Sequence, residues 1–159
     1  MTTHHASFDL ATPEDTAQMA ALLGATLQTG DTVLLSGPVG AGKTHIDRHL
    51  IQSLLTVPED VPSPTFTLVQ TYDTNAGTLW HADLYRIGSV HEIEELGLTE
   101  AFEQAICLIE WPDRLGPLEP ASALSLSFSD GASEDTRHLT ATWTNLRWAE
   151  PLEHLGRVS

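Results

Sequence analysis

Positive charge is scarce in this chain of 159 residues. Its 7 lysines and arginines stand against 22 aspartates and glutamates, which gives a formal net charge of −15 at pH 7. Proteins that bind nucleic acid on their own gain much of their affinity by neutralising phosphates with basic side chains. So large an acidic excess argues against that class of protein. A well-solvated acidic surface is the simplest interpretation.

Cysteine and long apolar runs are equally scarce. The single cysteine, Cys107, has no partner for an internal disulfide, and its place in the apolar run 105–109 predicts a buried core residue. No apolar run approaches the length of a membrane span. Residues 1–5 lack the charged and apolar regions of a signal peptide. We therefore expect a cytoplasmic protein without a membrane segment, with residues 1–159 forming one domain.

Lysine is the rarest basic residue, and the only one, Lys43, stands in a recognisable motif. Residues 37–44 read Gly-Pro-Val-Gly-Ala-Gly-Lys-Thr and fit G-x-x-x-x-G-K-[ST], the phosphate-binding loop of nucleoside triphosphatases. Its glycines allow backbone N–H groups to surround an anion. Lys43 reaches the β- and γ-phosphates, and the Thr44 hydroxyl completes a Mg²⁺ shell. The expected nucleotide-binding residues are Gly37, Gly40, Ala41, Gly42, Lys43, Thr44 and His45.

The surroundings of this motif favour a nucleotide site over an ordinary glycine-rich turn. The apolar run 32–35 predicts a buried strand before it, and apolar residues at helical spacing over 43–55 predict a helix after it. Guanine-specific members of this class read their base with an N/T-K-x-D motif. Because no second lysine exists to form that motif, we expect ATP, with Mg²⁺, as the ligand.

A phosphate loop needs an acid at the end of a neighbouring strand, bound to Mg²⁺ directly or through water. Glu110 follows the apolar run 106–109, and Asp83 follows the less apolar run 79–82. Both are candidate metal-shell and catalytic residues, and Asp83 is alternatively a residue that orients the attacking water. His81 and Arg86 flank Asp83. Trp111 either stacks on the base or packs in the core.

The segment 57–64 contains three prolines and follows the predicted helix directly. In this fold class that position often holds a switch segment that senses the γ-phosphate, and Ser63 and Thr65 offer hydroxyl groups for that purpose. A plain connecting loop explains the same residues.

The remaining patterns predict an α/β domain. Thr12 and Pro13 start a helix that continues through Leu27 and ends at Gly30. Strands over 66–72 and 78–84 pair as a hairpin, and Gly97 ends a short helix that begins at the capping box of Ser89. Another helical stretch begins at Thr99, and 105–109 is a buried parallel strand. Strands over 123–128 and 136–143 form an antiparallel addition to the sheet, and the tail over 145–155 is at most partly helical.

Read in order, these segments resemble the small bacterial ATPase family of the tRNA threonylcarbamoyladenosine-modification system, the TsaE (YjeE) type. The resemblance covers most of residues 32–112. It rests on five matching stretches, which are Gly40–Thr44, Ser63–Val69, His81-x-Asp83-Leu84-Tyr85-Arg86, Glu94–Gly97 and Ile106–Pro112. Residues from Ala121 on match only in pattern.

The resemblance implies a three-layer P-loop fold with a mixed sheet, parallel at its core and antiparallel at its edges, between helices. It implies ATP hydrolysis and assembly with two subunits of a threonylcarbamoyl transferase, so that tRNA is met only through the complex. It further implies that Thr44 and Glu110 serve Mg²⁺, that Asp83 is needed for hydrolysis, that residues 63–65 are the switch loop, and that Trp111 lies near the nucleotide.

This chain departs from the pattern of the resembled family at three places. Pro38-Val39 replaces the usual Asp-Leu, His45 replaces a hydroxyl residue that is able to touch the α-phosphate, and Ala82 replaces an aromatic residue. Two other functions therefore stay open beside the ATPase. One is an adaptor that binds nucleotide without hydrolysing it. The other is a small-molecule kinase, which is disfavoured because the six arginines are scattered.

Overall fold

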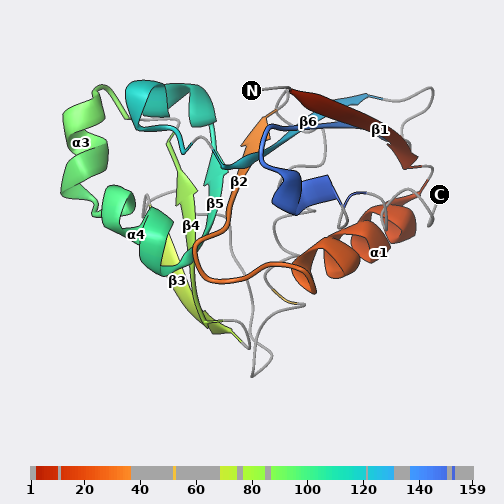
Figure 1. Ribbon diagram of the computed structural model, residues 1–159, viewed down its shortest axis with the longest axis horizontal. Helices are drawn as coiled ribbons and strands as arrows, with labels where there is room; N and C mark the ends of the chain where they lie inside the picture. The colour runs from red at the N-terminus through yellow and green to blue at the C-terminus, as the bar shows by residue number, and fades with distance from the viewer. Residues whose placement is uncertain are drawn as a thin grey trace.

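The computed structural model describes residues 3–10, 12–36, 52, 69–74, 77–84, 87–120, 122–130, 137–149 and 152. Its described strands form one seven-stranded sheet in the order β1-β7-β6-β2-β5-β4-β3 (Figure 1). The strands are β1 (His4–Leu10), β2 (Thr32–Ser36), β3 (Val69–Thr74), β4 (Gly77–Asp83), β5 (Ile106–Glu110), β6 (Leu124–Asp130) and β7 (Arg137–Trp143).

The centre of the sheet is parallel and its margins are antiparallel. β2 pairs in parallel with β5 on one side and β6 on the other, and β5 pairs in parallel with β4. β7 and β1 extend one margin with antiparallel pairings, and β3 closes the other. Every residue of β5 is buried, as expected for a parallel strand covered on both faces. The predicted mixed α/β architecture is confirmed.

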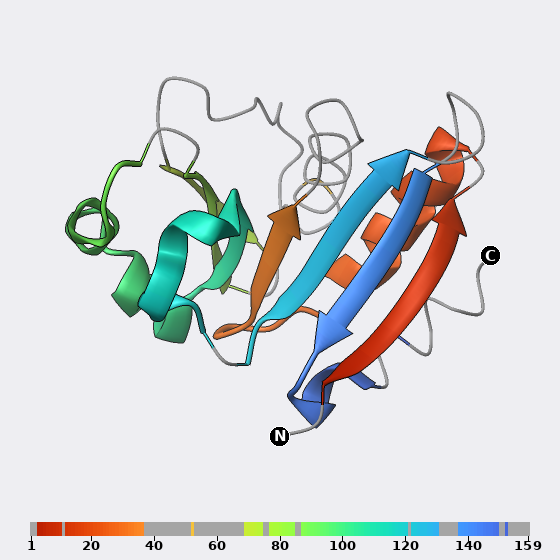
Figure 2. The same cartoon turned by 90° about the horizontal axis from the view of Figure 1, so that it is seen from above.

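Helices cover both faces of the sheet (Figure 2). On one face, α1 (Pro13–Gly24) packs Met19 and Leu23 against apolar side chains that include Val33 and Leu35 of β2. The other face is covered by α3 (Val90–Glu95), α4 (Leu98–Gln104) and the 3₁₀ segment η1 (Pro112–Leu118). Leu34 of β2 belongs to this second cluster, because successive strand residues point to opposite faces. No described helix is long and apolar enough to cross a membrane.

The predicted start of α1 is confirmed, and its predicted end is wrong. The Thr12 hydroxyl accepts a hydrogen bond from the Asp15 N–H at 3.1 Å, with Pro13 at the first helical position. The helix stops at Gly24 rather than continuing through Leu27. Side chains compete with the helical bonds there: the Thr26 hydroxyl donates to the Leu23 carbonyl. Leu27 is nevertheless buried in the core.

The two short helices on the other face follow the sequence signals. The Ser89 hydroxyl accepts from the Glu92 N–H, and the Glu92 carboxylate accepts from the Gly88 N–H, so the first turn of α3 is capped. Gly97 has φ = +84°, a left-handed conformation that disfavours residues with a Cβ atom. Gly97 ends the α3 turn and is also the N-cap of α4, which begins at Leu98, one residue before the predicted Thr99.

One strand was not predicted and one needs correction. The sequence patterns did not predict β1, because its polar alternation includes two histidines and its partner β7 lies more than 120 residues away in sequence. β6 was expected in an antiparallel addition, yet it pairs in parallel with β2 and is antiparallel only to β7. Period-2 patterning identifies a strand but does not give its direction. The predicted hairpin is confirmed as β3 and β4.

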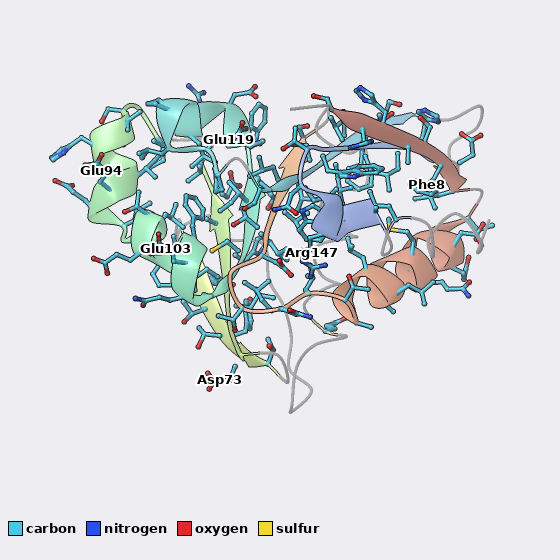
Figure 3. The ribbon with its side chains drawn as sticks, in the orientation of Figure 1. Phe8, Asp73, Glu94, Glu103, Glu119 and Arg147 are labelled. Carbon is cyan, nitrogen blue, oxygen red and sulfur yellow. The ribbon has the colours of Figure 1, made fainter. Side chains whose placement is uncertain are left out.

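An ion pair joins the loop before β2 to the C-terminal 3₁₀ segment η2 (Leu146–Trp148), at the amino end of the parallel strands. Arg147 donates to Asp31 through Nε at 2.8 Å and also through Nη2, and Nη2 donates to the Thr26 carbonyl at 2.6 Å. The guanidinium carbon lies 4.3 Å from the ring centroid of Trp148, which is fully buried. Figure 3 shows Arg147 between η2 and the segment that follows α1.

Candidate functional site

The candidate site lies at the carboxyl end of the parallel strands. Since β2, β5 and β4 run in the same direction, their last residues, Ser36, Glu110 and Asp83, meet at one edge of the sheet. Glu110 is paired in register with Asp83 on one side and with Leu35 on the other. Glu110, the last residue of β5, therefore lies between Asp83 at the end of β4 and the end of β2. The last residue of β2, Ser36, directly precedes Gly37.

Three polar side chains of this edge share one face of the sheet. His81 and Asp83 are two residues apart on β4, so they point to the same side. Asp83 is in register with Glu110, which places the Glu110 side chain on that side as well. This is the α1 face, because Leu108, two residues before Glu110, belongs to the cluster around Met19 and Leu23. The two predicted acids are thus neighbours on one surface.

Glu110 is buried and hydrogen-bonded. Its Oε2 atom lies 3.0 Å from Nε2 of His81, and the two side chains are 7% and 3% exposed. A carboxylate removed from water needs hydrogen-bond donors to offset the loss of hydration. When Glu110 is ionised its carboxylate only accepts hydrogen bonds, so Nε2 of His81 is then the donor in this pair.

Asp83 is half-buried, so it is more accessible to solvent than Glu110. The residue after it, Leu84, donates its N–H to the Glu110 carbonyl at 3.1 Å. This backbone bond continues the pairing of β4 and β5 past their last side chains. The separation of the two acids is therefore set by two paired backbones and not by flexible loops.

Trp111 has an unusual backbone conformation directly after Glu110. Its φ and ψ are 59° and 54°, and it is the only non-glycine residue with positive φ in the described part of the chain. Such conformations cost about 1 kcal/mol or more and often occur at functional sites. The half-buried indole packs against the cluster beneath α3 and α4. Core packing is thus observed, and stacking on a nucleotide base stays a prediction.

The remaining predicted site residues lie outside the described residues. They are Gly37, Gly40, Ala41, Gly42, Lys43, Thr44, His45, Ser63, Thr65 and Arg86. The strand predicted to precede the phosphate loop is confirmed, since β2 spans Thr32–Ser36.

The described acids suit Mg²⁺, which prefers oxygen ligands and is held in many enzymes by one or two carboxylates together with phosphate oxygens and water. Asp83 and Glu110 supply two carboxylates side by side. Within the described ranges no group of three or more His, Cys, Asp or Glu residues is arranged to hold a metal ion. Such a group is not required where the nucleotide itself supplies ligands.

The sequence did not predict the contact between His81 and Glu110. His81 was noted only as a neighbour of Asp83. The two-residue spacing indicates that His81 and Asp83 share one face of their strand. The position of Glu110 at the end of the apolar run 106–109 indicates an acid at the end of a buried strand. The contact follows only when the parallel register of β4 and β5, in which His81 pairs with Leu108, is known.

Comparisons with known proteins agree in one family. The family described as threonylcarbamoyl adenosine biosynthesis protein TsaE matches residues 10–139. The chain is 35% identical over 146 residues to the tRNA threonylcarbamoyladenosine biosynthesis protein TsaE of Bacillus subtilis, which covers 91% of the chain and 90% of that relative. It is 45% identical over 100 residues to the protein of that name from Rickettsia felis, which covers 63% of the chain and 58% of that longer relative.

A solved structure has the same architecture. The crystal structure of Bacillus subtilis YdiB superposes with a TM-score of 0.77 at 28% sequence identity, and the match covers 99% of this chain and 97% of that one. The agreement therefore extends over the strands outside the central parallel group as well as over the carboxyl edge.

Proposed function

Because the chain belongs to the TsaE family of threonylcarbamoyl adenosine biosynthesis proteins, we propose that it is the ATP-binding and ATP-hydrolysing subunit of a tRNA-modifying complex. In this proposal it acts in the cytoplasm with two transferase subunits. Those subunits place threonylcarbamoyl on an adenosine beside the anticodon, and the chain described here carries out no transfer itself.

One observation supports this proposal above the others. Asp83 and Glu110 are in register on adjacent parallel strands, and Glu110 is also in register with Leu35, two residues before Gly37. In this proposal the phosphate loop of residues 37–44 follows directly in sequence after β2, which ends at Ser36. In open α/β sheets, ligands bind outside the carboxyl ends of the strands. The acids therefore stand where a nucleotide and its metal ion would be bound.

The proposed roles divide binding from chemistry. Backbone N–H groups of residues 37–45 hold the phosphates, and Lys43 pairs with the β- and γ-phosphates. Thr44 and Glu110 hold Mg²⁺, directly or through water, and Mg²⁺ when bound neutralises charge on the phosphates. Asp83, the more exposed acid, orients the water that attacks the γ-phosphorus as the bond to the bridging oxygen breaks. Ser63 and Thr65 close on the γ-phosphate, and Trp111 lies near the nucleotide.

The charge of the chain supports a division of labour within the complex. The net charge is −15, and acidic side chains on α3 and α4, such as Glu94 and Glu103, point away from the sheet (Figure 3). Polyanionic tRNA is repelled by such a surface. The proposed partners therefore bind the tRNA, and this subunit contacts the partners.

A second candidate is an adaptor that binds ATP and switches its partners without hydrolysis. The observation that favours it is the pair of departures in the phosphate loop. Pro38 has no backbone N–H, and His45 stands where the resemblance to this family implies a hydroxyl residue able to touch the α-phosphate.

Phosphate release from ATP distinguishes the two candidates. We would measure it for the full chain alone, and again after the two transferase subunits are added. The ATPase proposal expects little release alone and a clear increase with the partners, and expects Asp83→Ala to abolish that increase while ATP still binds. No release in either mixture, with a complex that still forms only when ATP is present, would refute hydrolysis and support the adaptor.

A further inference from the structure

The buried contact between His81 and Glu110 suggests a role beyond packing. The two residues come from adjacent strands, and His81 pairs with Leu108, so its side chain lies one step below Glu110 on the same face. Their Nε2 and Oε2 atoms are 3.0 Å apart. Both side chains are almost fully buried, so bulk water competes little for the bond.

This contact restricts the direction of the Glu110 carboxylate. A glutamate has three side-chain torsions and can occupy several staggered rotamers. The backbones that carry His81 and Glu110 are held in register by the sheet. A hydrogen bond between their side chains therefore selects the rotamers in which Oε2 faces the imidazole.

The contact with His81 is compatible with metal binding by the same carboxylate. A carboxylate offers about four lone-pair sites, and the bond to His81 takes one of those on Oε2. A carboxylate oriented by such a bond can bind a metal ion or a metal-bound water through another lone pair. Outer-shell partners of this kind commonly orient metal-binding carboxylates.

We propose that His81 is a positioning residue that orients the Glu110 carboxylate toward Mg²⁺ in the nucleotide complex. This inference rests on the proposed function, because it requires that Mg²⁺ and ATP bind at the carboxyl edge. In this role His81 acts through Glu110 and needs no contact of its own with the metal ion or the nucleotide.

The test measures how strongly nucleotide binding depends on Mg²⁺. The affinity of the full chain for a fluorescent ATP analogue is determined at a series of Mg²⁺ concentrations and without Mg²⁺. For His81→Leu we expect the Mg²⁺ concentration at half-maximal effect to rise about 10-fold or more, the range found for outer-shell partners. Affinity in the absence of Mg²⁺ should stay at the wild-type value.

Two further variants of His81 separate positioning from folding. The amide nitrogen of glutamine extends to about the place of Nε2, so His81→Gln should recover most of the Mg²⁺ dependence. The shorter His81→Asn is also polar but does not reach Oε2, so it should resemble His81→Leu. If His81→Leu does not fold, the comparison of His81→Gln with His81→Asn decides the question.

A matched control is available at the opposite side of the sheet. His138 of β7 contacts Asp9 of β1 through Nδ1 at 2.8 Å, but these side chains are 40% and 90% exposed, and β6 and β2 lie between β7 and the strand that carries Glu110. His138→Leu removes a histidine–carboxylate pair of the same kind. It should leave the Mg²⁺ dependence unchanged.

A double variant tests whether His81 acts through Glu110. In a Glu110→Gln background, His81→Leu should cause no further loss of Mg²⁺ dependence, because non-additivity marks residues that work as one unit. Independent, additive losses would overturn the inference, and so would a His81→Leu protein with wild-type Mg²⁺ dependence. If the wild-type chain itself shows no effect of Mg²⁺ on ATP binding, the proposed function fails and the inference fails with it.

Discussion

The two ends of the parallel strands each hold a buried acid with a basic partner, and the two pairs are built differently. At the amino end, Asp31 accepts two hydrogen bonds from Arg147 and a third from the Gln28 N–H. At the carboxyl end, the contact between Glu110 and His81 joins Oε2 of the carboxylate to the single ring nitrogen Nε2, at 3.0 Å.

The difference indicates different uses. Arg147 is permanently charged, binds with two nitrogens, stacks on Trp148 and joins segments 116 residues apart in sequence. It holds a loop and the C-terminal 3₁₀ segment together. His81 holds a carboxylate at the edge where the chain leaves β2 for the predicted phosphate loop. We infer that the amino end serves stability and that the carboxyl end serves ligand binding.

The largest expected effect separates activity from stability at the carboxyl end. Glu110→Gln keeps the size of the side chain and an oxygen that accepts a hydrogen bond, but removes its charge. We expect ATP turnover in the reconstituted complex to fall about 100-fold or more, because charge stabilisation at the phosphates is lost. Phosphate release measures it. If turnover instead stays within about threefold of the wild-type rate, Glu110 does not hold the metal ion.

The amino end should show the reverse. Arg147→Ala leaves the buried Asp31 carboxylate without its guanidinium partner, and breaking such a pair costs about 3 kcal/mol. We expect the free energy of unfolding in urea to fall by about that amount, while ATP affinity per folded molecule stays unchanged. The matched control is the exposed Arg114 of η1. Arg114→Ala should change stability by less than about 0.5 kcal/mol, and equal losses from the two variants would refute the contrast.

Cys107, the second residue of β5, reports on the burial of the strand that joins the two ends. Burial raises the pKa of its thiol from 9.0 to about 12. The thiol therefore stays neutral in the folded chain at pH values where it ionises in the unfolded chain. Its contribution to stability is complete below pH 9 and is lost as pH rises.

Raising the pH from 9 to 10 should lower the free energy of unfolding by about 1 kcal/mol through this thiol alone. Urea unfolding of the wild type and of Cys107→Ala at both pH values measures the difference, because the other titrating groups are common to both proteins. In the folded state at pH 8 a thiol-specific reagent should react with Cys107 only as fast as the protein unfolds. Rapid reaction with the folded protein would show that β5 is accessible.

The smallest effect concerns the first residue of β2. Thr32 is 2% exposed, and within the described residues its Oγ1 atom has no hydrogen-bond partner. Thr32→Val removes this buried hydroxyl and keeps the shape of the side chain. We expect a gain of about 1 kcal/mol in the free energy of unfolding, since an unsatisfied buried polar group is costly. A loss of stability would mean that the hydroxyl is hydrogen-bonded in solution.

Local signals in the sequence predicted much of the fold. The cap at Thr12, the capping residues Ser89 and Glu92, and the left-handed Gly97 all appear where the pattern placed them. Each depends on residues within four positions of one another. The buried run of β5 and its terminal Glu110 were predictable because a parallel strand covered on both faces is apolar throughout.

Long-range pairing was not predictable from these patterns. The direction of β6, the existence of β1 and the contact of His81 with Glu110 all depend on register between strands far apart in sequence. The bond from Arg147 to Asp31 likewise spans 116 positions. A single sequence carries the side-chain alternation of a strand but not the identity of its neighbours.

A crystal structure of the chain with Mg²⁺ and a non-hydrolysable ATP analogue would locate the nucleotide directly. We expect phosphates at the carboxyl edge, beyond Ser36, with Mg²⁺ bound to Glu110 directly or through one water, and His81 still hydrogen-bonded to the same carboxylate. A nucleotide bound at the amino end near Asp31, or a metal ion with no contact to Glu110 even through water, would contradict this expectation.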